Sequence, residues 1–142
     1  MKKVFKTTSA TATVELGRKI GSLINEPCVI AFCGGMGSGK TCFTTGFVKG
    51  LDYYGEVSSP TFAIVNEYLG GRLPIYHFDM YRIQDEEEAT NIGFDEILDD
   101  KSSIKFIEWP QMVESFLPKK YKKITIVKLS KKSRNIILEE YN

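Results

Sequence analysis

Apolar runs alternate with segments of helical periodicity along the chain. Residues 28–33 are uncharged and mostly apolar, which is typical of a strand buried on both faces of a parallel sheet. Residues 4–7 and 103–109 are also predicted to be strands. Helical spacing predicts a helix that begins after Thr8 or Ser9 and ends near residue 24, with four residues on its apolar face. These are Leu16, Ile20, Leu23 and Ile24.

Two pairs of β-rich runs are each separated by a turn. Residues 62–69 and 73–79 flank Gly70-Gly71, which predicts a hairpin. Residues 122–129 and 134–139 flank a polar turn and predict a closing hairpin. Before the first pair, residues 57–61 are rich in Ser and Pro and predict a polar loop.

The remaining segments predict helices and complete the fold class. Residues 42–50 have helical spacing, and Pro110 suits the first turn of a brief helix. An acidic stretch predicts one or two short helices, with four apolar side chains turned inward: Ile92, Phe94, Ile97 and Leu98. We therefore expect residues 1–142 to form a single three-layer α/β domain, with a mixed, mainly parallel central sheet and hairpins. A ligand would lie at the carboxyl ends of its strands.

The composition is that of an ordinary soluble protein. The 142 residues are 42% hydrophobic and 26% charged, and the basic start of the chain is not followed by an apolar stretch. We expect a cytoplasmic protein without a membrane segment. The three cysteines, Cys28, Cys33 and Cys42, fit no zinc pattern, so we expect buried free thiols.

Charge is unevenly distributed although the net charge is only +1. Eight acidic residues and no basic one lie from Asp85 to Asp100, and eight basic residues and no acidic one lie from Lys119 to Arg134. The two runs are either solvated faces on opposite sides of the domain or, in the basic case, a surface for RNA or an acidic partner.

The most specific local motif follows the strand at residues 28–33. Residues 34–41 read GGMGSGKT and satisfy the phosphate-loop pattern G-x-x-x-x-G-K-[ST] between a strand and a helix. Its glycines allow backbone N–H groups to surround phosphates. Lys40 would then reach the β- and γ-phosphates, and the Thr41 hydroxyl would bind Mg²⁺. We therefore expect the three-layer α/β domain to be a P-loop NTPase domain.

A phosphate-bound Mg²⁺ usually has a carboxylate partner at the end of a neighbouring strand. Asp79 and Glu108 each end an apolar run, so both are candidates for a role at the nucleotide. His77 is the only histidine; structural and catalytic interpretations are equally open, and we assign it no chemistry. Trp109 belongs either to the core or to the site or a partner surface.

Together these motifs resemble those of the TsaE (YjeE) ATPases, which serve biosynthesis of threonylcarbamoyladenosine in bacterial tRNA. The resemblance covers most of the chain and rests on four motifs in the family's order and spacing. They are the phosphate loop, Ser59-Pro60-Thr61-Phe62 with Val65-Asn66-Glu67-Tyr68, His77-Phe78-Asp79-Met80-Tyr81-Arg82, and Ile107-Glu108-Trp109-Pro110.

The resemblance implies an ATPase that uses ATP and Mg²⁺ and works with the TsaD and TsaB proteins, which transfer threonylcarbamoyl to tRNAs that read ANN codons. It implies that Thr41 and Glu108 bind the metal, that Asp79 orients water or supports the site, and that Thr61 senses the γ-phosphate. It also implies nucleotide contacts along the phosphate loop, at the start of the first helix and in the final hairpin. The residues are Met36, Gly37, Ser38, Gly39, Lys40, Thr41 and Cys42, then Ser9 or Ala10, and Arg134.

Three positions in the loop depart from the family pattern. Gly35 stands where Asp is usual, so no role of that acid carries over to this chain. Ser38 replaces Ala, and Cys42 replaces a second Thr but keeps its backbone N–H. Phosphate binding is compatible with all three changes.

Other functions share parts of this pattern. A small-molecule kinase would have the same loop but needs several arginines and a lid, and this chain has four arginines and little spare length. GTPase motifs of the types Asn-Lys-x-Asp and Asp-x-x-Gly do not occur, which favours ATP. A nucleotide-gated binding subunit with negligible hydrolysis of its own remains an alternative.

Overall fold

The computed structural model describes residues 1–57 and 64–142. In this part of the chain, seven strands form one sheet. They are β1 (Lys2–Thr7), β2 (Val29–Cys33), β3 (Val65–Tyr68), β4 (Ile75–Asp79), β5 (Ile104–Glu108), β6 (Tyr121–Lys128) and β7 (Arg134–Tyr141). The helices are α1 (Ala10–Ser22), α2 (Lys40–Gly50), α3 (Glu86–Asn91), α4 (Phe94–Asp99) and the 3₁₀ helix η1 (Pro110–Phe116).

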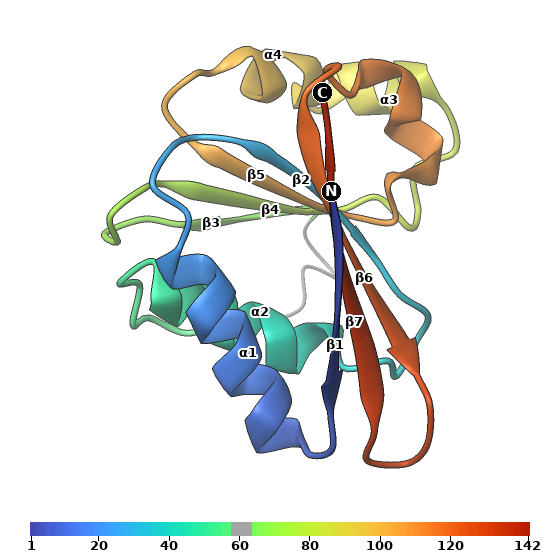
Figure 1. The fold of residues 1–142 in the computed structure, drawn as a ribbon. Coiled ribbons are helices and arrows are strands. Elements are labelled where there is room, and N and C mark those ends of the chain that lie inside the picture. Colours follow the sequence, from blue (N-terminus) through green and yellow to red (C-terminus); the bar gives the residue numbers. More distant parts are fainter. Residues whose placement is uncertain (58–63) are drawn as a thin grey trace.

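The sheet order is β1-β7-β6-β2-β5-β4-β3. The four central strands β6, β2, β5 and β4 run parallel, and β1 runs in the same direction, whereas β7 and β3 pair antiparallel with their neighbours. Helices α1 and α2 cover one face and α3 and α4 the other (Figure 1). The predicted mixed α/β sheet with two hairpins is confirmed.

Each face of the sheet has its own hydrophobic cluster, because side chains alternate along a strand. Ile30 and Phe106 pack towards α1 and α2, together with Phe43 and Phe47 of α2. Val29 and Ile107 point the other way, towards the α3, α4 and η1 layer. This alternation explains the unbroken apolar runs of β2 and β5, since both of their faces are covered.

Two apolar residues that the sequence pattern predicts to be buried are exposed in the structure. Leu23 is 71% exposed because α1 ends at Ser22 and Leu23 is already its C-cap residue. Ile92 is 37% exposed because it caps α3, and Gly93 turns the chain with a left-handed backbone before α4 begins. In both cases the helix ends before the apolar pattern does.

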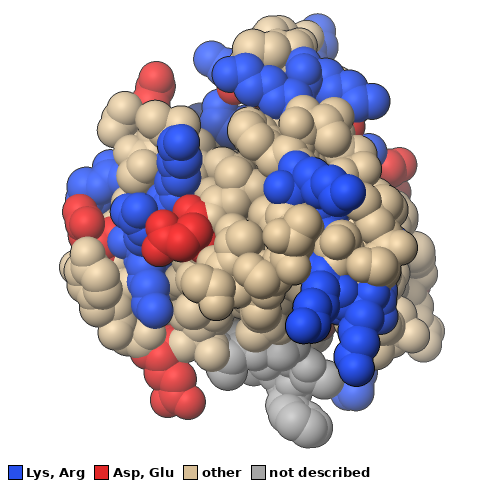
Figure 2. Space-filling model, turned by 60° about the horizontal axis from the view of Figure 1, so that its bottom comes forward, with Lys and Arg blue, Asp and Glu red and all other residues tan. Residues whose placement is uncertain are grey.

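The charged runs lie on different parts of the molecule. The acidic run forms α3 and α4, whereas the basic run spans β6 and the turn into β7. Figure 2 shows basic side chains in several separate groups on the face that lies at the bottom of Figure 1. Lys122 and Lys123 are consecutive in β6 and therefore point to opposite faces of the sheet, and Lys122 forms an ion pair with Glu140 at 3.5 Å. The lysines of residues 119–123 are thus divided between two faces.

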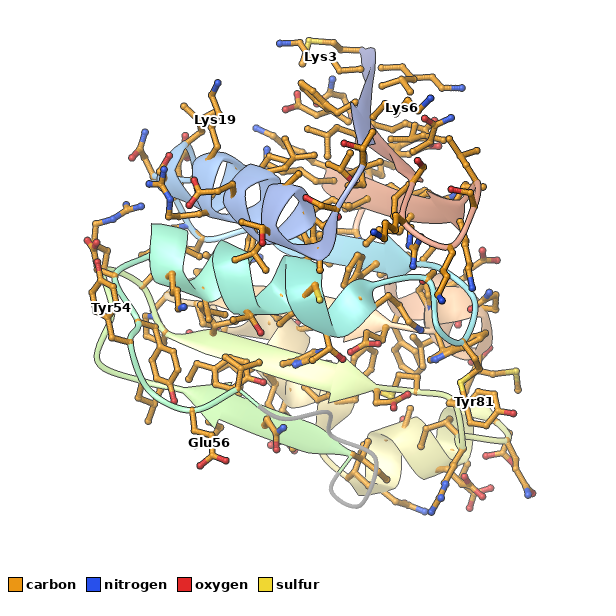
Figure 3. The ribbon with its side chains drawn as sticks, turned by 90° about the horizontal axis from the view of Figure 1, so that it is seen from below. Lys3, Lys6, Lys19, Tyr54, Glu56 and Tyr81 are labelled. Atoms are coloured by element: carbon orange, nitrogen blue, oxygen red, sulfur yellow. The ribbon has the colours of Figure 1, made fainter. Side chains whose placement is uncertain are left out.

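Helices α1 and α2 lie side by side at unusually short distance (Figure 3). The contact is made by two glycines on each helix, spaced four residues apart: Gly17 and Gly21, and Gly46 and Gly50. A Cβ atom built at Gly46 would lie 1.8 Å from the carbonyl oxygen of Val14, which leaves no room for a side chain. This packing brings the N-terminal ends of both helices to the phosphate loop.

Arg72 connects the other ends of the same two helices. Its guanidinium donates to the carbonyl oxygens of Gly21 and Ile24 in or after α1, at 3.4 and 3.1 Å, and to that of Gly50 in α2, at 3.0 Å. Carbonyls at a helix C-terminus lack partners within the helix, so a cation there satisfies them and the helix dipole.

Across the described ranges 1–57 and 64–142, no helix is long and apolar enough to cross a membrane.

Candidate nucleotide-binding site

The phosphate loop joins β2 to α2 at the carboxyl end of the sheet. Gly37 and Gly39 adopt left-handed φ angles of 72° and 104°, a conformation that side-chain-bearing residues rarely take. Gly39 is the N-cap of α2, so Lys40 and Thr41 belong to the first helical turn rather than to the loop. The predicted helix start at residue 42 was two residues late.

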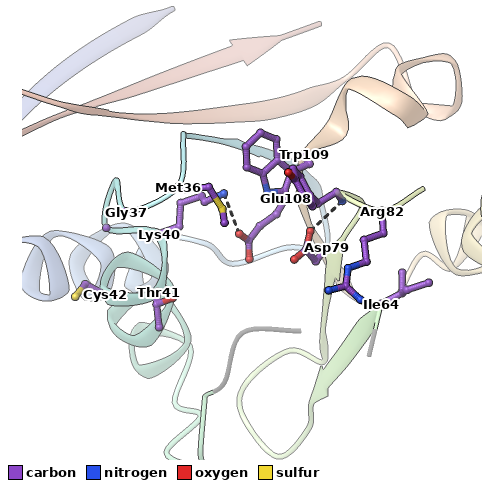
Figure 4. A pocket seen from close by; sticks show the side chains of 12 residues that line it. Met36, Gly37, Lys40, Thr41, Cys42, Ile64, Asp79, Arg82, Glu108 and Trp109 are labelled. Carbon is purple, nitrogen blue, oxygen red and sulfur yellow. Dashed lines mark hydrogen bonds and ion pairs between the residues drawn. The ribbon is translucent and has the colours of Figure 1, made fainter. Parts of the chain in front are cut away.

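A pocket of about 500 Å³ opens between this loop and the ends of β4 and β5. Figure 4 shows side chains from several elements converging on it. Eight predicted site residues line it: Met36, Gly37, Gly39, Lys40, Thr41, Cys42, Asp79 and Glu108. Trp109, for which the site was one of two open interpretations, also lines the pocket, as do three residues that had no predicted role at the nucleotide: Ile64, Tyr81 and Arg82. The chain itself offered a signal for Tyr81 and Arg82, which closely follow Asp79.

The register of the sheet places the two candidate acids together. Asp79 and Glu108 are paired across β4 and β5, and Glu108 also neighbours Phe32 of β2. Both acids lie on the face that α2 covers. The Asp79 carboxylate accepts a hydrogen bond from the backbone N–H of Tyr81 at 3.0 Å, which fixes its orientation.

Glu108 is buried and surrounded by cationic or hydrogen-bonding groups. One oxygen, Oε1, lies 3.4 Å from Lys40 Nζ, and the other, Oε2, forms a short hydrogen bond with His77 Nε2. Burial acts to raise the pKa of this carboxyl group, but the His77 hydrogen bond and the charges of His77 and Lys40 outweigh it, so the pKa lies below its ordinary value. Glu108 is therefore ionised at neutral pH.

His77 thus contacts the predicted site, a connection that the sequence did not reveal. Its side chain is buried, and its other ring nitrogen, Nδ1, lies 3.0 Å from the hydroxyl of Tyr68. His77 and Glu108 are 31 positions apart in the chain, and only the pairing of β4 with β5 brings them together.

Trp109 follows Glu108 with a left-handed backbone, φ 55° and ψ 58°. This conformation is rare for a bulky residue and turns the chain out of β5 into η1. The Lys40 ammonium lies 4.2 Å from the centre of the indole ring, and Tyr81 packs against the same ring at 5.0 Å. Of the two open interpretations of Trp109, the structure supports a place at the site.

A second pocket of about 290 Å³ lies beside the first, on the α1 side of the loop. Ala10 and Arg134, both predicted nucleotide contacts, line it together with Ser9, and Gly39 and Cys42 line both pockets. Arg134 Nε donates to the carbonyl oxygen of Ser38 at 2.7 Å, so the final hairpin is tied to the phosphate loop. Lys131 and Lys132 add positive charge to this pocket.

Thr61 lies outside the described residues. The Ser38 hydroxyl is buried and has no hydrogen-bond partner among the residues that the structure describes. The cysteines are free thiols as predicted, but all three are half-buried rather than fully buried.

The donor set suits a phosphate-bound Mg²⁺ better than an independent metal centre. Within residues 1–57 and 64–142, no three His, Cys, Asp or Glu side chains gather into a metal-binding group. Mg²⁺ commonly takes only one or two protein oxygens and completes its coordination with phosphates and water. The Thr41 hydroxyl and the Glu108 carboxylate, which line one pocket, match that chemistry.

Comparisons with known proteins agree on one family. The sequence profile described as "Threonylcarbamoyl adenosine biosynthesis protein TsaE" matches residues 7–136. The chain is 34% identical over 132 residues to the tRNA threonylcarbamoyladenosine biosynthesis protein TsaE of Bacillus subtilis (strain 168), covering 93% of this chain and 82% of the relative. It is 36% identical over 128 residues to the protein of the same name from Treponema pallidum (strain Nichols), covering 90% and 93% of the two chains.

The fold also matches a solved structure. The crystal structure of YdiB from Bacillus subtilis superposes with a TM-score of 0.81 and 27% sequence identity, over 100% of this chain and 87% of that chain.

Proposed function

The chain belongs to the TsaE family, and from this membership and the site geometry we propose that it is an Mg²⁺-dependent P-loop ATPase. Its activity would be required for threonylcarbamoyladenosine modification of tRNAs that read ANN codons, and it would act with the TsaD and TsaB proteins. The proposal rests mainly on one observation. The phosphate loop, with Lys40 and Thr41, lines the same pocket as Asp79 and Glu108.

In this proposal, the two adjoining pockets would hold the two parts of a nucleotide. The triphosphate would lie in the larger pocket, where the N-terminus of α2 and the Lys40 ammonium attract negative charge. The rest of the nucleotide would extend past Gly39 and Cys42 into the smaller pocket, beside Ala10 and Arg134. Lys40 would exchange its contact with Glu108 for one with the β- and γ-phosphates.

Two side chains would hold Mg²⁺ and one acid would direct the attacking water. The Thr41 hydroxyl and the Glu108 carboxylate are the proposed protein ligands. When bound, the ion supplies positive charge that offsets the charge of the phosphate oxygens. Asp79, whose carboxylate is oriented by the Tyr81 N–H, would position the water, and Thr61 would respond to the γ-phosphate.

Lys40→Ala tests the phosphate site. We expect at least a hundredfold loss of ATP affinity measured by calorimetry, with loss of hydrolysis and an unchanged circular dichroism spectrum, because the ammonium lies at the pocket and not in the core. Lys49→Ala is the matched control, since Lys49 is an exposed lysine at the other end of the same helix. Normal ATP binding and turnover in Lys40→Ala would refute the proposed site.

A reconstituted reaction tests the pathway and the partners. We expect ATP turnover to be low for the chain alone and to rise when TsaD, TsaB and tRNA are added, with threonylcarbamoyladenosine detected in the digested tRNA by mass spectrometry. Modification that needs ATP binding but no added hydrolysis by this chain would instead support a nucleotide-gated binding subunit.

A further inference from the structure

A line of buried polar side chains crosses three strands behind Glu108. The Tyr68 hydroxyl in β3 lies 3.0 Å from His77 Nδ1 in β4. His77 Nε2 in turn bonds Glu108 Oε2 in β5. The line ends at the pocket, where Glu108 Oε1 faces Lys40.

Hydrogen-bond chemistry gives this line a direction. An ionised carboxylate can only accept, so His77 Nε2 must carry the proton that bonds Glu108. The other ring nitrogen, Nδ1, is bonded to the Tyr68 hydroxyl, which can either accept or donate a hydrogen bond. Each partner therefore fixes one nitrogen of the ring, as in carboxylate–histidine pairs that orient ligands in metal sites.

The surroundings prevent the imidazole from turning. His77 is 2% exposed. The Phe106 ring meets it edge-on at 5.6 Å, and the Tyr68 ring is tilted against it at 5.8 Å. A hydrogen bond between groups that exclude water is stronger and better oriented than one at the surface.

We propose that His77, held by Tyr68, is a positioning residue for Glu108. Because His77 binds Oε2, the other oxygen, Oε1, is the one that faces ligands in the pocket. This inference rests on the proposed nucleotide site. Without His77 the Glu108 carboxylate could rotate and pair with Lys40 through either oxygen, and its orientation towards Thr41 would be lost. His77 acts only through Glu108 and does not touch the nucleotide.

The protonated nitrogen can be observed directly, because His77 is the only histidine in the chain. In ¹⁵N-labelled protein, long-range ¹H–¹⁵N correlation spectra should show a proton on Nε2 and a single ring orientation. Tyr68→Phe removes the hydroxyl that holds Nδ1 and should give more than one ring orientation. Tyr76→Phe is the matched control, because Tyr76 precedes His77 in β4 but packs in the cluster on the opposite face. A wild-type spectrum without a proton on Nε2 would overturn the proposal.

Binding of ATP provides a second test that does not depend on turnover. Trp109 is the only tryptophan and lines the pocket, so its fluorescence can report ATP binding with and without Mg²⁺. His77→Phe should raise the Mg²⁺ concentration for half-maximal effect by about tenfold to a hundredfold, the usual result of removing such a partner. Metal-free ATP affinity should change less than about threefold, because Lys40 and the loop are retained.

A conservative variant and a double variant distinguish a positioning role of His77 from a general effect on stability. His77→Gln keeps a side-chain donor and should recover most of the Mg²⁺ dependence. In a Glu108→Gln background, His77→Phe should add little further effect, because the residue through which it acts is already altered. Additive effects, or an unchanged Mg²⁺ dependence in His77→Phe, would overturn the positioning role.

The outcomes distinguish this inference from the proposed function. If the wild-type chain binds no ATP, the nucleotide site itself is refuted. If the wild type binds ATP in an Mg²⁺-dependent way but His77→Phe has the same Mg²⁺ requirement, only the positioning role is refuted. If His77→Phe fails to fold, Tyr68→Phe carries the test, with an expected shift of about threefold in the Mg²⁺ requirement.

Discussion

At the scale of single residues, two acids at neighbouring strand ends have different surroundings. Glu108 is buried between His77 and Lys40, which keep its pKa low, whereas Asp79 is only half-buried and accepts from the Tyr81 N–H. A buried carboxylate with fixed partners suits a constant ligand role. A less enclosed carboxylate suits contact with water, which agrees with the roles proposed for the two.

The surroundings of Cys28 lead to a pH prediction at the same scale. Burial raises the pKa of this thiol, and the charges of Lys122 and Lys105 offset this only in part. The thiolate is the reactive form, so the pH midpoint for alkylation of Cys28 by iodoacetamide should be higher in the folded than in the unfolded chain. Peptide mass spectrometry over a pH series measures it.

The raised pKa of the Cys28 thiol also determines how this group changes the stability of the fold with pH. Because the folded pKa of Cys28 is raised, the neutral thiol favours the fold below the unfolded pKa of about 8.5, and this contribution is lost as pH rises through the folded value. Equal alkylation midpoints in the folded and unfolded chains would contradict the prediction.

At the scale of elements, the site depends on how closely α1 and α2 pack. The first helix brings Ser9 and Ala10 to the smaller pocket and the second brings Lys40 and Thr41 to the larger one. Glycines at their contact let the two backbones approach, so the N-termini of both helices reach the same loop. Larger side chains at this helix contact would move the smaller pocket away from the larger one.

Gly46→Ala tests this packing. The added Cβ would lie 1.8 Å from the Val14 carbonyl oxygen, so the helices must move apart. We expect a loss of at least about 2 kcal/mol in the free energy of unfolding, measured with denaturant, even though alanine favours helices.

Gly35→Ala is the control for Gly46→Ala. Apart from its two chain neighbours, no described residue has a heavy atom within 4 Å of a Cβ built at Gly35, and its φ is outside the left-handed range, so the change should stay within about 0.5 kcal/mol. Equal unfolding free energies in the two variants would show that the helix contact tolerates a side chain.

At the scale of the whole molecule, two groups of lysines from the basic run lie at opposite ends of the parallel strands. Lys131 and Lys132 line the smaller pocket beside the phosphate loop. Lys120 lies near Cys28, at the other end of β2, with Lys119 next to it in the chain. The run is therefore not one surface: one part faces the proposed nucleotide and the other does not.

Replacing the lysines of each group in pairs tests whether only the group beside the phosphate loop contributes to ATP binding. Lys131→Gln with Lys132→Gln should weaken ATP binding by about threefold to tenfold at low salt and less at high salt, because charge interactions are screened within about 10 Å at 0.1 M. Lys119→Gln with Lys120→Gln removes the same charge from exposed lysines at the far end and should have little effect. Calorimetric titration at two salt concentrations compares them, and equal effects of the two pairs would mean that only net charge matters.

The sequence by itself determined the features that depend on neighbours in the chain. The phosphate loop, the strand before it and the helix after it were predictable because glycine conformation and apolar periodicity act over a few residues. Strand ends at Asp79 and Glu108 were predictable for the same reason. The order and spacing of the motifs also identified the family, which the sequence profile confirms over residues 7–136.

Tertiary structure alone decided which distant groups meet. Arg134 reaches the carbonyl oxygen of Ser38 across 96 positions, and His77 reaches Glu108 across 31, because strand order and register set these contacts and no local pattern encodes them. The exposed Leu23 and Ile92 show the same limit, since a periodic pattern does not reveal where a helix ends. Side-chain partners, burial and the resulting pKa of Glu108 depend on surfaces that exist only after the sheet and its two helical layers have assembled.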